Sequence, residues 1–438
     1  MVMLERLPRA SEQRRRGSVA QLLGASYLIT LLAMVSGPVV ARVLGPTDRG
    51  LFASATVYAT VVIQLLNLGV SLAIAHALTN RLQPPERLLG AVLRFAAATV
   101  LPACLAAALT VGLLLEHLHG WAAIISFGII ASAPLGVLGL SLQSFLLAAS
   151  ALRPLALLRV APILSSFIVV MTLVVTGHLT LESYLALYFA LGLLSALAAF
   201  LAVGVRPSGS APLKPLLRFG LRAYPGSFGN VVNLQLDQAL LAALVAPAQL
   251  AFYAIAVTIS TVPQLIGEAV AARAVGGVAG EDRALEPHKA EGYFRMNVLV
   301  CGVAVVGVAA LAPTLVPLIY GHAFSPVVEP LLILLPGALA LATANVAGLC
   351  LIVLGRPGVT SVAELAAVAV TGIGLWLALG PFGIRGAAAV SSAAYIVRLA
   401  IQLRVLRTYG VRRLVPTLGD GKLLVHLVRA RLYSYSLP

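Results

Sequence analysis

The sequence predicts an all-α, polytopic membrane protein with about 12 transmembrane helices in two parallel six-helix repeats around a central cavity. Three observations predict this fold class. Hydrophobic residues make up 60% of the 438 residues and charged residues only 10%, too few to cover a soluble protein. The hydrophobic residues form long blocks with the charges between them. A segment near the start of the chain recurs near its midpoint.

Each apolar block is close to or longer than the roughly 20 residues that a helix needs to cross about 30 Å of hydrocarbon. The blocks are continuous, whereas strands of a membrane β-barrel are short and alternate polar with apolar residues. We expect spans over 18–41, 51–79, 88–115, 121–148, 154–177, 182–204, 219–245, 249–272, 294–318, 329–353, 359–380 and 386–406. Prolines should interrupt or bend several of them, at Pro38, Pro102, Pro134, Pro162, Pro225, Pro263 and Pro336.

The positive charges predict the orientation of these spans. Of the 30 Lys and Arg residues, only Arg42, Arg49 and Arg385 fall in the connections after odd-numbered spans. Because basic residues favour the cytoplasmic side, both termini should be cytoplasmic and the number of spans even. The formal net charge of +15 is then explained by orientation and by anionic inner-leaflet lipid, so we do not expect nucleic acid as a partner.

The two tails of the chain are basic. Residues 1–17 precede a full-length span and lack the short apolar core and cleavage site of a secretory signal, so we expect a cytoplasmic tail and a retained first span. Residues 407–438 should form a second cytoplasmic tail, either an amphipathic helix on the membrane surface or a partly disordered segment.

An internal repeat divides the chain. The segments that start at Leu44 and at Val245 align without gaps at an offset of 201 residues, and each joins the first two spans of its half. A polar, proline-rich linker lies between the halves. We therefore expect an N-terminal bundle over 18–204, a cytoplasmic linker over 205–218 and a C-terminal bundle over 219–406.

Polar residues inside the spans are the candidate site. They recur at spacings of three and four, which place them on one face of each helix. The residues are Thr60, Gln64 and Asn67 in the second span, Asn230, Asn233 and Asp237 in the seventh, and Thr261, Gln264 and Glu268 in the eighth. The repeat places Thr60 on Thr261 and Asn67 on Glu268. Either these faces line a shared substrate cavity, or they are polar contacts between packed helices.

Arginines near the span ends are further candidates. Arg94, Arg159, Arg222 and Arg273 lie towards the cytoplasmic side, as phosphate or gate residues, and Arg42 ends the first span on the far side. The guanidinium group suits phosphate, although such residues also serve as anchors that extend to the membrane surface.

No pattern in the sequence predicts a cofactor or a metal. Cys104, Cys301 and Cys350 lie within apolar blocks and are expected to be small buried residues. The seven histidines are scattered, and there is no GxxxxGK[ST] loop for ATP.

Five segments resemble a known family, in the order in which they occur there. They are ARVLGPTDRGLFA, NLQLDQALLAALVAPAQLAFYAIA, LVPLIYGHAFSPVVEPLLILLPGALALATANV, VLGRPG and LGPFGIRGAAAVSSAAYIV. Together they resemble the bacterial polysaccharide flippases of O-antigen type, within the multidrug/oligosaccharidyl-lipid/polysaccharide exporter superfamily. Arg42 and Asp237 match motif positions of that family, whereas Asn230 and Asn233 match only in character.

The resemblance implies a transporter of the bacterial cytoplasmic membrane, not an enzyme. It would flip polyprenyl-diphosphate-linked oligosaccharide by alternating access for cell-surface polysaccharide biosynthesis. Its partners would be this lipid-linked substrate, membrane lipids and other polysaccharide-assembly proteins. Three alternatives stay open: a multidrug or small-solute cation antiporter of the same superfamily, a membrane glycosyltransferase or polymerase, and a non-transporting scaffold. The chain lacks the two further spans usual in lipid II flippases, which argues against that cargo.

Overall fold

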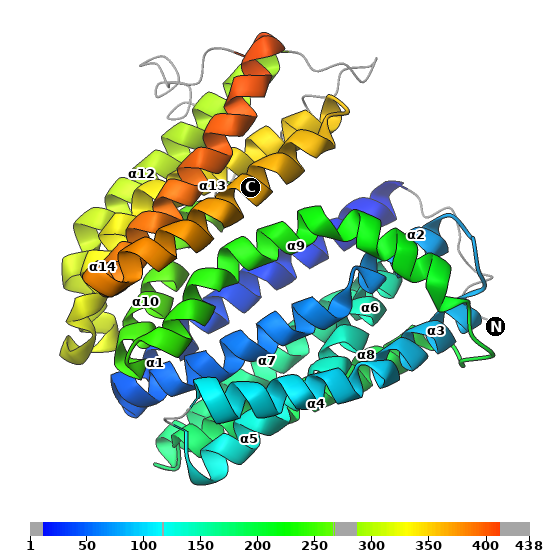
Figure 1. The fold of residues 1–438 in the computed structure, drawn as a ribbon, viewed down its shortest axis with the longest axis horizontal. Coiled ribbons are helices and arrows are strands. Elements are labelled where there is room, and N and C mark those ends of the chain that lie inside the picture. The colour runs from blue at the N-terminus through cyan, green and yellow to red at the C-terminus, as the bar shows by residue number, and fades with distance from the viewer. Residues whose placement is uncertain (1–11, 116–117, 266, 268–286, 412–438) are drawn as a thin grey trace, which may run out of the picture. The chain divides into compact units, whose positions relative to one another are not determined.

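The computed structural model describes residues 12–115, 118–265, 267 and 287–411 (Figure 1). Of residues 12–27, 30, 223–233 and 287–289 it describes only the course of the backbone. The described chain is helical almost throughout and contains no strand. The helices are α1 (Glu12–Asn67), α2 (Val70–Thr79), α3 (Pro85–Ala98), α4 (Val100–Leu109), the π-helix η1 (Thr110–Leu114), α5 (Gly120–Ala131), α6 (Ala133–Ala148), α7 (Leu152–Val175), α8 (Leu181–Val203), α9 (Leu213–Leu244), α10 (Pro247–Ser260), α12 (Pro287–Tyr320), the 3₁₀-helix η2 (His322–Val327), α13 (Val328–Val353) and α14 (Pro357–Thr408).

The predicted all-α membrane fold is confirmed. Eight helical segments of the described chain are long and apolar enough to cross a bilayer, or nine if α5 and α6 form one span bent by 41°. Helix α14 covers two predicted spans, α1 covers the first span and most of the second, which continues in α2, and α9 covers the predicted span 219–245 as far as Leu244. Apart from short breaks, all described residues of the predicted spans are helical.

Two connections between predicted spans are single-residue breaks instead of loops. Helix α1 is non-helical only at Gly45 (φ 74°, ψ 175°), and α14 only at Gly383 (φ 53°, ψ −136°). A positive φ is accessible to glycine at little cost, because glycine has no Cβ. Pro46 follows Gly45 directly and suits the first position of the helical segment that resumes there. The chain therefore turns between these spans without a loop.

Two other breaks fall inside predicted spans, close to a proline. Helix α3 ends at Ala98 and is followed by Thr99, just before Pro102, and α5 ends at Ala131 and is followed by Ser132, just before Pro134. Proline has no N–H to donate to the preceding turn. The hydroxyls of Thr99 and Ser132 each donate to a carbonyl three residues earlier, at 2.7 Å in both cases. The predicted interruption of these spans is confirmed, whereas Pro162 and Pro336 lie inside continuous helices.

The chain forms two compact units. Unit 1 consists of residues 1–231 and 238–251, and unit 2 of residues 232–237 and 252–438. Helix α9 contributes to both units, and it already begins at Leu213, inside the predicted linker. The division into the bundles 18–204 and 219–406 stays a prediction.

Unit 1 is packed around α1 and α6. Helix α1 contacts α5, α6, α7 and α8, and α6 also contacts α2 and α8. One cluster of buried side chains, which includes Ile74, Leu89 and Phe145, joins α2, α3 and α6. A second cluster, which includes Phe52 and Ile130, joins α1 and α5. This packing holds α1, α7 and α8 in contact around the space described below.

Unit 2 is centred on α13, which contacts both α12 and α14. Gly337 allows the close approach of α14: a Cβ at this position would lie 2.6 Å from the Cα of Ser392. The Ser392 hydroxyl donates to the Ile333 carbonyl on α13 at 2.7 Å. Cys301 and Cys350 are buried free thiols in this unit, as expected, whereas Cys104 in unit 1 is only partly buried.

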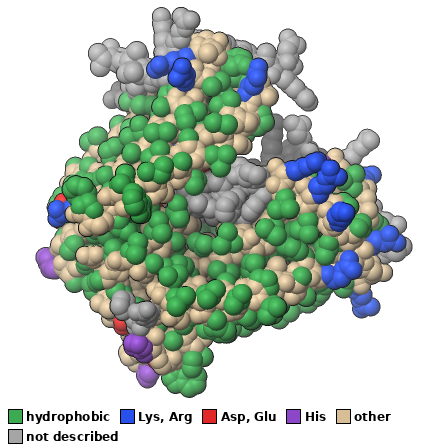
Figure 2. All heavy atoms as spheres, in the orientation of Figure 1, with side chains coloured by type: hydrophobic (Ala, Val, Ile, Leu, Met, Phe, Trp, Pro, Cys, Tyr) green, Lys and Arg blue, Asp and Glu red, His purple; other side chains and the backbone are tan. Residues whose placement is uncertain are grey.

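The surface of the helices is apolar, as a bilayer requires. Leu101, Val175 and Trp376 expose 79%, 87% and 83% of their area, which a water-soluble protein rarely tolerates in bulk. Basic side chains gather at the end of unit 1 formed by α2, α3 and the start of α9 (Figure 2). The exposed ones at this end are Arg81, Arg87, Arg206, Lys214 and Arg218. The positive charge is therefore concentrated at one end of the unit.

Candidate functional site

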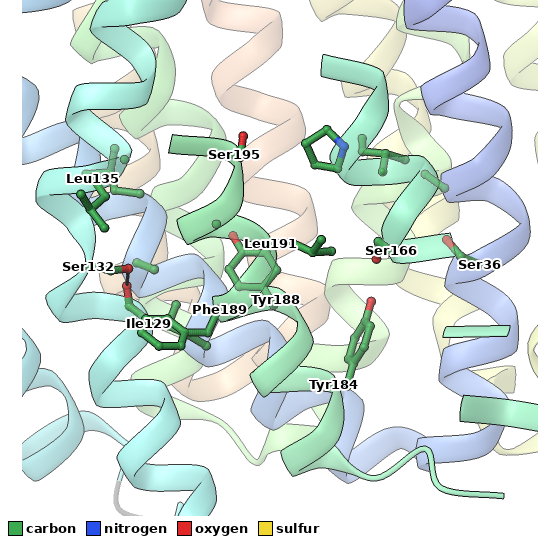
Figure 3. Close-up of a pocket in the computed structure, with 17 residues that line it drawn as sticks. Ser36, Ile129, Ser132, Leu135, Ser166, Tyr184, Tyr188, Phe189, Leu191 and Ser195 are labelled. Atoms are coloured by element: carbon green, nitrogen blue, oxygen red, sulfur yellow. Dashed lines mark hydrogen bonds between the residues drawn. The ribbon is translucent and has the colours of Figure 1, made fainter. Parts of the chain in front are cut away.

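Unit 1 encloses a partly open cavity of about 360 Å³ (Figure 3). Helices α1, α6, α7 and α8 supply most of its lining, with the end of α5. Small residues leave the space between them, notably Ala33, Ala59, Gly136 and Gly192. None of the described residues that line the cavity is charged.

Hydroxyl groups line this apolar space. Figure 3 shows Ser36, Ser166, Ser195 and the side chains of Tyr184 and Tyr188 around it. These five hydroxyls form no hydrogen bond with any residue that the structure describes. A sixth, on Ser132, differs because it donates to the Ile129 carbonyl at 2.7 Å. The cavity can therefore offer five donor and acceptor groups to a guest without breaking an existing bond.

The predicted residues of the second span lie beside this cavity but do not line it. Thr60 and Gln64 directly follow the lining residues Ala59 and Ile63 on α1. The Thr60 hydroxyl donates to the Thr56 carbonyl at 2.9 Å, within its own helix.

Asn67 is engaged in a buried contact between helices. Its Oδ1 accepts a hydrogen bond from the Ser71 hydroxyl at 2.8 Å, and that hydroxyl lies 3.3 Å from the hydroxyl of Ser141 on α6. This is the arrangement expected of polar contacts between packed helices.

Asp237 is the predicted residue with the most complete set of partners. Its side chain is 2% exposed, and Oδ2 accepts hydrogen bonds from the hydroxyls of Tyr253 at 2.5 Å and Ser391 at 3.0 Å. Asp237 is therefore paired within unit 2, and a role for it in a substrate cavity stays a prediction. The three residues come from α9, α10 and α14 and tie these helices together.

The other predicted residues of the seventh and eighth spans are less completely described. The Thr261 hydroxyl donates to the Thr258 carbonyl at 2.6 Å, and Gln264 is partly buried. The side chains of Asn230 and Asn233, and Glu268 altogether, lie outside the described residues. The shared cavity formed by the matched faces therefore stays a prediction.

The predicted arginines lie on the surface wherever they are described. Arg42, Arg94, Arg159 and Arg222 are exposed, and Arg273 lies outside the described residues. Arg94 donates to the Ala211 carbonyl at 3.2 Å, which fastens α3 to the segment before α9. A role for these residues in phosphate binding stays a prediction.

Sequence reasoning missed a buried ion pair in unit 2. Glu364 and Arg398 lie in the two arms of α14, and their side chains meet at 2.7 Å. Arg398 also donates to Oδ1 of Asn345 on α13 at 3.3 Å. Among the described residues, Nε and Nη1 of Arg398 and Oε2 of Glu364 have no hydrogen-bond partner. The signal was available, because each residue is a charge inside a predicted span.

Sequence reasoning also missed the five free hydroxyls of unit 1. Tyr184, Tyr188 and Ser195 do follow a helical spacing along one face of α8. Whether such a hydroxyl is free depends on the neighbouring helices, so the spacing alone could not separate these residues from ordinary buried ones.

Several solved structures share this fold. The lipid II flippase MurJ in an inward closed conformation aligns with a TM-score of 0.75 over 95% of this chain and 93% of its own, at 11% identity. An inward-facing multidrug resistance transporter of the MATE family and MOP superfamily gives 0.65 over 87% and 94%, at 15% identity. A mutant of the Vibrio cholerae MATE transporter VcmN gives 0.54 over 91% and 99%, at 15% identity. At these identities the likeness shows the fold alone.

The sequence itself places the chain in a family. None of the curated proteins matches it. The model of a family described as "Polysaccharide biosynthesis protein" matches residues 39–329, more than half of the chain and most of the described part of unit 1. The chain therefore belongs to this polysaccharide biosynthesis protein family.

Proposed function

We propose that this protein flips a polyprenyl-diphosphate-linked oligosaccharide across the bacterial cytoplasmic membrane by alternating access, for the synthesis of cell-surface polysaccharide. The observation that carries the proposal is the cavity in an apolar helical bundle, with five hydroxyls that bond to none of the described residues, in a chain of the polysaccharide biosynthesis family. The likeness in fold to a structure described as a lipid II flippase supports the same class of transport.

The physical task explains why hydroxyls inside the bundle matter. Hydrocarbon cannot hydrogen-bond a sugar headgroup, and even one charged side chain at the bilayer centre costs about 2.5–3.5 kcal/mol on insertion scales. A polar path inside the protein lowers this barrier while the polyprenyl tail stays in the lipid. The task needs no bond to be made or broken, so we propose a transporter and not a glycosyltransferase or polymerase.

Orientation and partners follow from the charge distribution. The basic end of unit 1 should face the cytoplasm, because basic residues favour that side of the membrane. We propose that both termini are cytoplasmic as well. Anionic lipid of the inner leaflet would then surround Arg81, Arg87 and Lys214. The partners are the lipid-linked cargo, membrane lipids and the proteins that build and polymerise the same glycan.

Reconstitution tests the proposal directly. The purified chain is placed in vesicles that hold a polyprenyl-diphosphate-linked trisaccharide with a fluorescent sugar, and a membrane-impermeant quencher reports how much label lies on the outer face. We expect quenching to proceed beyond the initial outer-leaflet fraction in vesicles with protein only. The proposal would be wrong if the quenched fraction of the label were the same in vesicles with and without protein. In cells, deletion of the gene should leave the lipid-linked glycan on the inner leaflet.

A multidrug or small-solute antiporter is the second candidate. The fold likeness to multidrug transporters favours it, with TM-scores of 0.65 and 0.59 for inward- and outward-facing forms. A deletion strain with normal surface polysaccharide but raised drug sensitivity would support this candidate against the flippase.

A further inference from the structure

The cavity of unit 1 carries more hydrogen-bonding groups than the protein itself uses. The hydroxyls of Ser36, Ser166, Ser195, Tyr184 and Tyr188 have no partner among the described residues. Tyr188 is 42% exposed and the other four residues are partly buried, so the hydroxyls face the open space of the cavity, where hydrocarbon cannot hydrogen-bond them. Five such groups around one space can together hydrogen-bond a polar guest in that space.

We propose that this cavity is a subsite for one uncharged sugar residue of the cargo, an inference that rests on the proposed function. Each hydroxyl of a sugar both donates and accepts, as the serine and tyrosine hydroxyls do. Tyr184 and Tyr188 lie four residues apart on one face of α8, so that their rings can pack against the apolar face of a sugar ring. The volume of about 360 Å³ lies in the usual range of ligand pockets.

The lining selects against charge. None of the described residues around the cavity is charged, and an ionised carboxylate or phosphate buried without a partner costs far more than a hydroxyl. A uronic acid would therefore be rejected. A hydrocarbon chain would leave all five hydroxyls unpaired, so a lipid tail is also a poor guest.

A cation lies beside the cavity, not within it. The guanidinium of Arg49 lies 5.3 Å from the centre of the Phe52 ring, and that ring lies 4.2 Å from the ring of Tyr184 in the cavity lining. Nε of Arg49 is buried without a hydrogen-bond partner among the described residues. The diphosphate of the same cargo thus has a cation available next to the sugar subsite.

The cavity contains its own matched control. Ser132 lines the same space, but its hydroxyl already donates to the Ile129 carbonyl at 2.7 Å. Ser166 and Ser195 have the same side chain with the hydroxyl uncommitted. Alanine at 166 or 195 should therefore remove both a donor and an acceptor for the guest, whereas alanine at 132 removes only an acceptor, because the Ser132 proton is already committed.

The test measures binding to the full chain in nanodiscs by native mass spectrometry. The probes are polyprenyl-diphosphate carrying one N-acetylhexosamine and the same lipid carrying one hexuronic acid. We expect the uncharged probe to bind at least tenfold more tightly. Ser166→Ala and Ser195→Ala should each weaken it by about two- to tenfold, the effect of one hydrogen bond. Ser132→Ala should weaken binding less than either of these variants.

Two results separate the failure of the subsite from the failure of the proposed function. Equal affinity for both probes, or equal effects of Ser166→Ala, Ser195→Ala and Ser132→Ala, overturns the subsite while the wild type still moves lipid-linked sugar in vesicles. A wild type that moves neither probe overturns the proposed function and the subsite with it. If an alanine variant unfolds, Ser166→Cys and Ser195→Cys keep the volume while weakening the hydrogen bond.

Discussion

The buried pair of Glu364 and Arg398 gives a quantitative prediction for the stability of unit 2. The two side chains approach to 2.7 Å, and both residues are almost fully buried. At an effective dielectric constant of about 20, unit charges at this separation attract by about 6 kcal/mol. Removing one partner leaves a buried charge without compensation, which typically costs about 3–5 kcal/mol. We expect this loss for Glu364→Met and for Arg398→Met individually.

The double variant separates a paired role from two independent ones. Replacing both charges by methionine removes the desolvation cost together with the attraction, so the double variant should lie within about 2 kcal/mol of the wild type. The free energy of unfolding is measured in mixed micelles by titration with a denaturing detergent, for the wild type, both single variants and the double variant.

A matched control is available at the surface of the same unit. Arg385 and Glu329 approach to 2.8 Å, almost the same distance, but their side chains are 64% and 52% exposed. Solvent screens such pairs to about 0.2–1 kcal/mol, so Glu329→Met should cost no more than that. Single losses at Glu364 and Arg398 of less than 1 kcal/mol, or a double loss equal to their sum, would refute the reasoning.

Three further predictions concern packing, hydrogen bonding and orientation. Gly337→Ala should cost about 1–3 kcal/mol by overpacking, because its Cβ would lie 2.6 Å from the backbone of α14; the same unfolding titration measures this. Tyr253→Phe should cost about 1.5–3 kcal/mol, since it removes the hydrogen bond from the Tyr253 hydroxyl to the buried carboxylate of Asp237, and an unchanged midpoint would contradict this. In intact cells a membrane-impermeant maleimide should label the variant His178→Cys and not the variant Arg206→Cys. Labelling of the unmodified chain gives the background, and the reverse pattern would invert the proposed orientation.

The sequence predicted the helical spans because their signal is local. A block of roughly 20 apolar residues must be helical in a bilayer whatever surrounds it. The breaks depend on finer chemistry. Pro102 and Pro134 indicated two of the breaks. The connection between the first two predicted spans is a single residue, Gly45, and only its backbone angles show this. The sequence likewise did not show that α14 is helical on both sides of Gly383.

The candidate site was less predictable, because it depends on which polar groups find partners. Asn67 was selected by its spacing, yet it bonds to Ser71 in a contact between helices. Ser166 was not selected, although its hydroxyl is free in the cavity. Both residues are polar positions in apolar helices, and a single sequence contains no record of the neighbouring helix that satisfies one and not the other.

Hydrogen-bond satisfaction is therefore a better guide to function inside these helices than polarity alone. In a bilayer, a polar group must be paired within the protein or must meet a guest or water in a cavity. Asp237, with its bonds from Tyr253 and Ser391, meets the first condition. The free hydroxyls of Ser166 and Ser195 meet only the second. If transport depends on Asp237 and not on these two serines, then the packing of unit 2 limits the transport cycle. The cavity of unit 1 is in that case only a consequence of the small residues where α1, α6, α7 and α8 meet.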